Sequence, residues 1–161
     1  MTWSEVVADK SLRNLIYKIE LDEWGNIVMR PSSNKHSLVK AAVLLDLDRR
    51  KEVGTIFPNC VIETPKGVKV ADVIWASPTF MTRNQVETPY RAAPELCLDI
   101  ISDSRVEMAQ KRDLYFAGGA KEAWTCSVEG HVTFYNHGGE TAISDLFPDF
   151  PKIVETGLPN T

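Results

Sequence analysis

A short apolar segment followed by a helix start constrains the fold of this chain more than any other feature. Residues 94–102 read Pro-Glu-Leu-Cys-Leu-Asp-Ile-Ile-Ser, a run of strand-forming residues bounded by proline and serine. Such a run predicts a strand that is buried on both faces. Asp99 interrupts it. Because a buried, unpaired carboxylate is destabilising by several kcal/mol, we expect Asp99 to contact either a structural cation or a metal ion.

The residues after this strand predict a helix that carries a lysine. Ser104 followed by Glu107 is the capping-box pattern, and the glycine pair at 118–119 is typical of a helix end. Inside the helix, Lys111 lies one turn before Tyr115. The helix is apolar over much of its circumference, so we expect Lys111 to be partly enclosed.

A second lone carboxylate lies in a predicted hairpin. Residues 55–63 and 68–75 are strand-like and are joined by a Thr-Pro-Lys-Gly turn. Asp72 lies among the valines of the second strand. We expect Asp72, Asp99 and Lys111 to converge on one cleft, because they come from neighbouring strands and the helix that follows. Two carboxylates and a lysine in that arrangement suit a hard divalent cation such as Mg²⁺ or Mn²⁺.

The same residues also have a purely structural interpretation. Glu107 and Lys111 have the spacing of an exposed ion pair on one helix face. The two aspartates would then accept hydrogen bonds from backbone amides. Spacing alone leaves both interpretations open.

The rest of the chain predicts short elements around this centre. Together they favour an α/β or α+β fold, in which helices flank a mixed central sheet and β-hairpins are added at the ends. We expect one domain over 1–161, with an N-terminal helix and hairpin extension at 1–31, a core at 32–128, and a hairpin and tail at 129–161. The individual elements are a helix over 3–15, a hairpin of 17–21 and 27–29, a helix over 35–48, a long loop with at most one helical turn over 78–93, a hairpin of 122–128 and 131–135, and a docked aromatic tail over 146–151.

Composition and charge restrict the classes of function. Hydrophobic residues make up 43% and charged residues 25% of the chain, which argues against disorder. Because the formal net charge is -4, binding of nucleic acid would require a local basic face, for which 49–51 and the pair Arg83 and Arg91 are the candidates. The three widely spaced cysteines fit neither a disulfide framework nor a zinc site.

The chain shows no signal for a membrane. The longest apolar stretch, 38–47, is too short to cross a bilayer and contains Lys40 and Asp46. The first residues lack the basic and apolar regions of a signal peptide. We therefore expect a cytoplasmic protein without a membrane partner.

Several short motifs occur in an order that resembles the Uma-two family, a bacterial group of endonucleases in the PD-(D/E)XK superfamily. The resemblance covers nearly the whole chain from about residue 16. The motifs are Ile19-Glu20 with Gly25 after them, Met29-Arg30-Pro31, His36-Ser37, Pro65-Lys66-Gly67 before Ala71-Asp72-Val73, the segment 94–102, Lys111 with Tyr115, 117–119 before Trp124, and Phe147-Pro148-Asp149-Phe150.

The resemblance implies a restriction-endonuclease-like core and assigns roles to individual residues. Asp72 and Asp99 would be the two acids that bind Mg²⁺ or Mn²⁺, together with the Ile100 carbonyl. Lys111 would be the catalytic lysine, displaced onto the following helix. Two further candidate site residues follow from the resemblance: Glu20, which matches a family glutamate, and His36, which lies where the family has histidine or an acid.

The implied activity is Mg²⁺-dependent hydrolysis of phosphodiester bonds in DNA by a homodimeric endonuclease. The homodimer is expected because relatives of this fold cleave duplexes as dimers and because the late hairpin and aromatic tail offer apolar surface. Three departures from the family pattern leave enzymatic activity open: Ala71 replaces proline, Asp99 replaces glutamate, and Ile101 replaces lysine. The alternatives are a catalytically inactive nuclease-fold module that binds nucleic acid or protein, and an unrelated α/β protein whose buried acids are structural.

Overall fold

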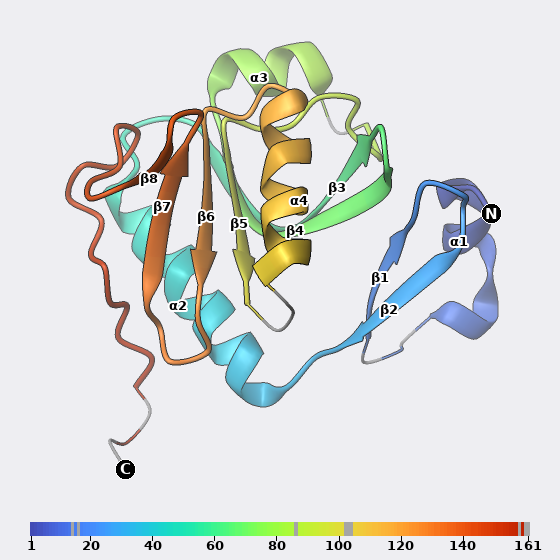
Figure 1. The fold of residues 1–161 in the computed structure, drawn as a ribbon, viewed down its shortest axis with the longest axis horizontal. Helices are drawn as coiled ribbons and strands as arrows, with labels where there is room; N and C mark the ends of the chain where they lie inside the picture. The colour runs from blue at the N-terminus through green and yellow to red at the C-terminus, as the bar shows by residue number, and fades with distance from the viewer. Residues whose placement is uncertain (14, 16, 86, 102–104, 158, 160–161) are drawn as a thin grey trace.

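The computed structural model of the protein describes residues 1–13, 15, 17–85, 87–101, 105–157 and 159. Its centre is a six-stranded sheet of order β3-β4-β5-β6-β7-β8, in which β5 and β6 are parallel and the other neighbours are antiparallel (Figure 1). The predicted mixed central sheet is confirmed. The strands are β3 (Thr55–Thr64), β4 (Gly67–Ala76), β5 (Leu96–Ile100), β6 (Glu122–Cys126), β7 (Val132–Asn136) and β8 (Gly139–Thr141).

Two helices cover opposite faces of this sheet. Helix α2 (Asn34–Arg50) lies behind it and α4 (Arg105–Ala117) in front of it in Figure 1. Along β5, Leu98 packs in the cluster that contains the apolar side of α2, whereas Cys97 packs in the cluster that contains Tyr115 of α4. Because successive side chains of a strand point to opposite faces, β5 is buried on both sides, as its apolar run predicts. The predicted cap at Ser104 lies outside the described residues.

The C-terminal aromatics belong to the core. Phe147 and Phe150 are buried, and their ring centroids lie 6.1 and 4.9 Å from that of Trp124 in β6. The docked tail is therefore confirmed. Because they are buried, these aromatics cannot form the apolar surface that the predicted homodimer would use.

The N-terminal helix is shorter than predicted. Helix α1 (Trp3–Ala8) has the expected capping box between Thr2 and Glu5. It ends at Asp9, whose extended backbone breaks the helical path and whose carboxylate accepts the Ser11 amide at 2.9 Å. A side chain that caps a new turn competes with helix continuation, so the chain enters the 3₁₀ turn η1 (Lys10–Leu12) instead.

The predicted first hairpin forms a sheet of its own. Strands β1 (Tyr17–Leu21) and β2 (Ile27–Pro31) pair antiparallel, and β1 lies along β4 of the central sheet. The hairpin extends from the β3–β4 side of the molecule in Figure 1, away from the C-terminal tail. Lys18 and Glu20 of β1 contact Asp72 and Val70 of β4.

The segment 78–93, for which the sequence predicts a long loop with one helical turn, begins with the longer helix α3 (Pro78–Asn84). Ser77 caps this helix and Pro78 opens it, which is the usual order of these residues at a helix start. Two turns of helix are too short to show an apolar period, which explains the missed prediction.

Cys60, Cys97 and Cys126 are buried free thiols. Within the part of the chain that the structure describes, no helix has the length and hydropathy needed to cross a bilayer.

Candidate active site

The two predicted acids lie next to each other where the β4–β5 ladder stops. Its last pair is Val73 with Leu98, so Asp72 and Asp99 are the next residues on the two strands. The Ile100 amide donates to Asp72 Oδ2 at 2.8 Å, and the Asp72 amide donates to Asp99 Oδ1 at 3.3 Å. The carboxylates therefore satisfy amides that the ladder no longer pairs, which agrees with the structural interpretation of the sequence in this one respect.

Helix α4 holds Asp99 from the other side. Lys111 Nζ lies 3.3 Å from Asp99 Oδ1, and the Tyr115 hydroxyl donates to Asp99 Oδ2 at 2.7 Å. Residues one turn apart on a helix project in the same direction, so both can reach one carboxylate. The side chain of Lys111 is 12% exposed, as its apolar surroundings in the sequence predict.

Glu20 enters the same cluster from β1. Its Oε2 accepts the Val70 amide at 2.6 Å and lies 2.8 Å from Lys111 Nζ. Arg30 Nε, on β2, lies 3.5 Å from Glu20 Oε1. The ammonium of Lys111 thus contacts Glu20 and Asp99, whereas Glu107 lies 3.2 Å from Arg30.

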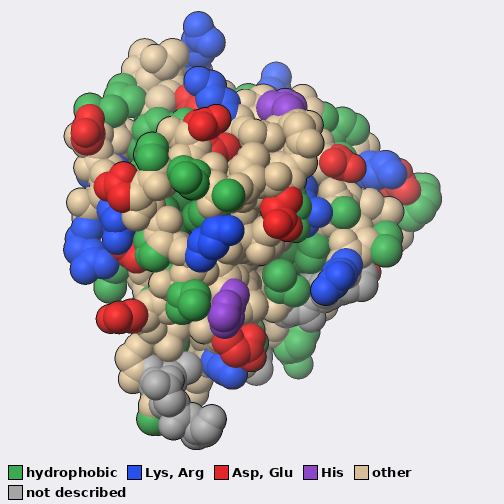
Figure 2. All heavy atoms as spheres, turned by 60° about the vertical axis from the view of Figure 1, so that its left-hand side comes forward, with side chains coloured by type: hydrophobic (Ala, Val, Ile, Leu, Met, Phe, Trp, Pro, Cys, Tyr) green, Lys and Arg blue, Asp and Glu red, His purple; other side chains and the backbone are tan. Residues whose placement is uncertain are grey.

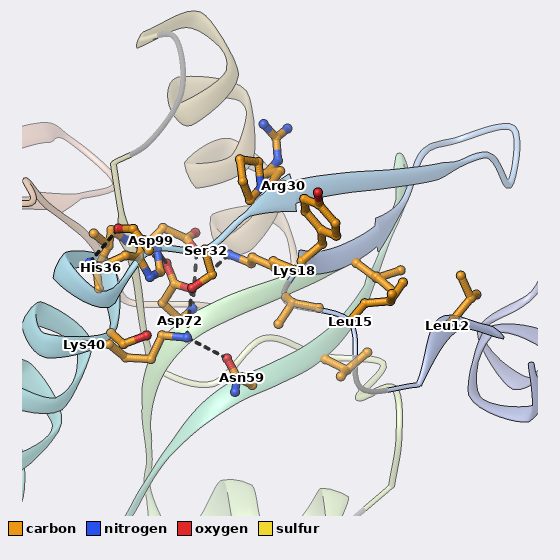
Figure 3. Close-up of a pocket in the computed structure, with 18 of the residues that line it drawn as sticks. Leu12, Leu15, Lys18, Arg30, Ser32, His36, Lys40, Asn59, Asp72 and Asp99 are labelled. Atoms are coloured by element: carbon orange, nitrogen blue, oxygen red, sulfur yellow. Dashed lines mark hydrogen bonds and ion pairs between the residues drawn. The ribbon is translucent and has the colours of Figure 1, made fainter. Parts of the chain in front are cut away.

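A residue that the sequence did not single out occupies the centre of the cluster. Lys18 Nζ lies 3.2 Å from Asp72 Oδ1 and 3.1 Å from Asp99 Oδ1 (Figure 3). Lys18 and Glu20 alternate on β1 and so share one face of that strand. The signal in the sequence that could have pointed to Lys18 is its position two residues before Glu20, the candidate site residue on the same strand.

Helix α2 contributes two further nitrogen groups. His36 Nε2 lies 3.6 Å from Asp72 Oδ2, and its Nδ1 is buried without a hydrogen-bond partner among the described residues. Lys40 Nζ lies 3.7 Å from Asp72 Oδ1 and donates to Asn59 Oδ1 at 3.0 Å. The structure therefore brings all the predicted side chains together: Asp72, Asp99, Lys111, Glu20 and His36. The Ile100 amide, too, lies in this cluster.

The charges of the cluster stabilise one another. Burial opposes ionisation of Asp72, but His36, the Lys18 ammonium and the Ile100 amide together hold the pKa of Asp72 below its ordinary value. Burial likewise opposes ionisation of Glu20, and the ammonium groups of Lys111 and Lys18 lower its pKa. For Lys18, burial disfavours the charge, yet Asp99 and Asp72 raise the pKa above its usual range.

The cluster lies at one end of a cleft of about 620 Å³. Figure 3 shows Lys18 and Lys40 beside the two aspartates, and Leu12 and Leu15 at the opposite end. A ligand that fills such a cleft would place an anionic group against the basic side chains and an apolar or aromatic part against the leucines.

The acids fit a hard divalent cation. Asp72 Oδ1 and Asp99 Oδ1 contact the same Lys18 nitrogen, so their separation is less than twice an ion-pair distance. Mg²⁺ is commonly held by one or two carboxylates and completed by water. Among the described residues no group of three or more histidine, cysteine, aspartate or glutamate side chains suits a metal.

The basic segment 49–51 is engaged with acids of its own helix. Arg49 Nη2 and Arg50 Nε lie 2.9 and 2.8 Å from Asp46 Oδ1, and Lys51 Nζ lies 3.6 Å from Asp48 Oδ1. Figure 2 shows acidic and basic side chains interspersed on the face that it presents. Lys18, Lys40 and Lys111, by contrast, line one cleft.

No family model matches the chain, and no curated protein matches it. A search of solved structures finds the crystal structure of "a putative nuclease belonging to DUF820" from Anabaena variabilis ATCC 29413. That protein is 17% identical, and the superposition has a TM-score of 0.64 and covers 84% of this chain and 79% of that chain. At this identity the likeness concerns the fold. The central sheet and flanking helices of this chain therefore have the fold of that structure.

Proposed function

We propose that this protein is a Mg²⁺- or Mn²⁺-dependent endonuclease of the Uma-two family, which hydrolyses phosphodiester bonds in DNA. The observation that carries the proposal is the convergence of Asp72 Oδ1 and Asp99 Oδ1 on one cationic group at the buried end of a cleft. Two lines of support come from elsewhere: the order of motifs along the sequence, and a structural neighbour described as a nuclease of DUF820.

Asp72 and Asp99 would hold the metal ion, with the Ile100 carbonyl as a further candidate oxygen ligand. When bound there, a divalent ion supplies charge stabilisation at the phosphate and makes a bound water more acidic. Tyr115 fixes the orientation of the Asp99 carboxylate through its 2.7 Å hydrogen bond. Positioning of this kind keeps the ligand oxygen where the reaction needs it.

Lys111 fills the role of the superfamily lysine from the following helix. Its ammonium is held by Glu20 at 2.8 Å and by the Val70 carbonyl at 3.1 Å, next to Asp99. In this position it can stabilise negative charge on the phosphate or orient the attacking water. The two held contacts limit its motion, so the orientation of the ammonium does not depend on the substrate.

The shape and charge of the cleft favour a nucleic acid as the anionic substrate. Lys40 lies 3.7 Å from Asp72, and Arg30 lines the same cleft, so both can contact phosphates beside the reacting one. The apolar end, which contains Leu12, Leu15 and Tyr17, suits the sugar and base of a nucleotide.

A plasmid-nicking assay tests the proposal. Supercoiled DNA is incubated with the protein in Mg²⁺, in Mn²⁺ and in EDTA, and the same assay is run on Asp72→Asn. We expect nicking by the wild type with either ion, and loss of nicking in EDTA and in the variant. The matched control is Asp145→Asn, which changes an exposed aspartate and should nick at the wild-type rate. Equal nicking by Asp72→Asn and the wild type would refute the assigned site.

One observation favours a second candidate, a nuclease-fold module that binds nucleic acid without cutting it. Lys18 pairs with both aspartates, and Lys40 and Lys111 pair with one each, so the protein's own ammonium groups compensate the charge of the acids. This candidate predicts binding of DNA but no nicking with any divalent ion and no measurable binding of Mn²⁺ by calorimetry. The nicking assay and the titration together distinguish the two candidates.

We also propose a homodimer, as expected from the sequence. Since the tail aromatics are buried, exposed residues such as Ile143 and Ile153 would have to supply the apolar part of the interface. Sedimentation equilibrium at micromolar concentration decides the question. A mass equal to that of one 18.0 kDa chain would contradict the dimer.

A further inference from the structure

The Lys18 ammonium lies at the position that a cation shared by the two aspartates would take. A cation bound by both aspartates would lie between Asp72 Oδ1 and Asp99 Oδ1, and Lys18 Nζ lies there, 3.2 and 3.1 Å from the two oxygens. Oxygen ligands lie roughly 2.0–2.6 Å from Mg²⁺ or Ca²⁺. An ion between these oxygens would therefore overlap the ammonium or lie against it. Two positive groups in such close contact repel each other strongly in a partly buried site.

Lys18 differs in this respect from the other lysines of the cleft. Lys40 Nζ approaches Asp72 alone, at 3.7 Å, and is bonded to Asn59. Lys111 Nζ approaches Asp99 alone among the two aspartates, and Glu20 holds it at 2.8 Å. Among the described residues, Lys18 is the lysine whose nitrogen lies within ion-pair distance of both acids.

The backbone that carries Lys18 is anchored independently of the ammonium. Two residues along β1, Glu20 binds the Val70 amide at 2.6 Å, and the next carbonyl, of Leu21, accepts a hydrogen bond from Lys69 Nζ at 3.4 Å. The side chain of Lys18 is 16% exposed and lines the cleft. Lys18 can thus leave the acids by rotating about its flexible four-carbon stem, without any movement of the hairpin.

We propose that Lys18 and the divalent cation compete for the same position, so that the ion binds only when the Lys18 ammonium leaves Asp72 and Asp99. This inference rests on the proposed function, because it concerns the ion of that site. The displaced ammonium remains in the cleft, where it can pair with a phosphate of the substrate. Lys18 is therefore a residue that weakens metal binding in the absence of substrate and supports it when an anionic substrate is present.

The competition makes a prediction about stability as well as affinity. Without Lys18 and without metal, less positive charge offsets the negative charges of the two buried carboxylates, which destabilises the fold. A divalent ion would supply the missing positive charge. Binding of a ligand to the folded state raises stability by an amount that grows with its affinity, so the gain from metal should be larger without Lys18 than with it.

The test compares wild type, Lys18→Met and Lys35→Met by calorimetric titration with Mn²⁺ and by thermal unfolding in EDTA and in Mn²⁺. Methionine keeps the length of the lysine stem and removes the charge. Lys35 is a matched control because it pairs with Glu129 at 3.5 Å and does not line the cleft. If Lys18→Met does not fold in EDTA, Lys18→Gln replaces it, since the amide can still donate to a carboxylate.

We expect Lys18→Met to bind Mn²⁺ about tenfold more tightly than the wild type, because a directly opposing charge has been removed. Its Tm in EDTA should be lower than that of the wild type, and Mn²⁺ should raise its Tm by more. Lys35→Met should match the wild type in both measurements. Lys18→Gln should bind Mn²⁺ more tightly than the wild type as well.

The unfavourable outcomes separate this inference from the proposed function. If the wild type binds Mn²⁺ and Lys18→Met binds it equally or more weakly, the competition is refuted and the metal site stands. If neither protein binds Mn²⁺, both the competition and the metal dependence of the proposed nuclease are refuted.

Discussion

Asp72 and Asp99 hold each other's strands together where the β4–β5 ladder ends. The Asp72 amide donates to the Asp99 carboxylate at 3.3 Å, while the Asp72 carboxylate accepts the amide of Ile100, the residue after Asp99. Each acid thus has a structural contact as well as an oxygen directed at the Lys18 ammonium. These backbone contacts orient both carboxylates, which are 1% and 3% exposed.

The hydroxyl of Tyr115 should contribute to stability through Asp99. Tyr115→Phe removes the donor at 2.7 Å from Asp99 Oδ2 and leaves a buried carboxylate oxygen with one partner fewer. We expect the free energy of unfolding to fall by about 1–3 kcal/mol, measured by urea denaturation. Tyr135→Phe is the matched control, since Tyr135 lies on β7 with its ring against Arg112. Equal losses in the two variants would contradict the assigned role of the Tyr115 hydroxyl.

Lys111 and Glu20 should be energetically coupled. Lys111→Met leaves the buried Glu20 carboxylate without the ammonium at 2.8 Å, which we expect to destabilise the protein by about 3–5 kcal/mol. Adding Glu20→Gln should recover part of the loss. A double-mutant cycle by chemical denaturation should give a coupling energy of about 0.5–3 kcal/mol. Additive effects of the two substitutions would show that the pair does not interact.

Lys111 should matter for nicking more than for metal binding. A charged lysine has no lone pair to offer a metal, so Lys111→Met should keep the Mn²⁺ affinity within a few-fold of the wild type and lose nicking. Far-UV circular dichroism at the assay temperature verifies that the variant is folded. Nicking at the wild-type rate would exclude Lys111 from the reaction.

The free energy of unfolding should fall at acid pH, because Asp72 and Glu20 become protonated. Their folded pKa values lie below the ordinary 3.8 and 4.5, so both groups stabilise the folded state fully above those values. As the pH drops below them, the unfolded chain takes up protons first and the contribution is lost on the way to the folded pKa. Urea denaturation between about pH 3 and 7 should show this loss. In Asp72→Asn the free energy of unfolding should depend less steeply on pH in this range. An unchanged dependence would argue against the lowered pKa of Asp72.

Lys18 acts on the opposite side of the pH scale. Its folded pKa is raised above the ordinary 10.5, so its contribution is fully present below that value and is lost only as the pH rises through the folded pKa. Because the Lys18 ammonium also lowers the pKa of Asp72 and of Glu20, the free energy of unfolding of Lys18→Met should depend less steeply on pH on the acid side than that of the wild type.

The docked tail should be part of the cooperative core. Phe150 is buried against Trp124 and Phe134, so Phe150→Ala should lower the free energy of unfolding by about 3–5 kcal/mol. Leu45→Ala, on α2 and 62% exposed, should change it by less than about 0.5 kcal/mol. A small effect of Phe150→Ala in thermal and urea unfolding would mean that the tail unfolds separately.

Elements with local signals could be predicted from the sequence. Strand β5 (Leu96–Ile100) lies in an apolar run between a proline and serines, and the hairpin around Asp72 consists of two strand-like runs joined by a turn. Local sterics and burial produce such patterns within a few residues. Local patterns mispredict an element where a side chain competes with helix formation, as at Asp9, or where the helix is only two turns long, as in α3.

Long-range packing determines which charged side chains form ion pairs. The sequence allowed Lys111 to pair with Glu107, one turn away, yet its ammonium contacts Glu20 on β1 and Asp99 on β5. Lys18 reaches Asp99 across 81 positions of the chain. Such contacts depend on where β1 lies against β4, which is set by packing of the whole fold and leaves no periodic trace in the sequence. The pairing of the acids was therefore readable from neighbouring strands, whereas the cation between them was not.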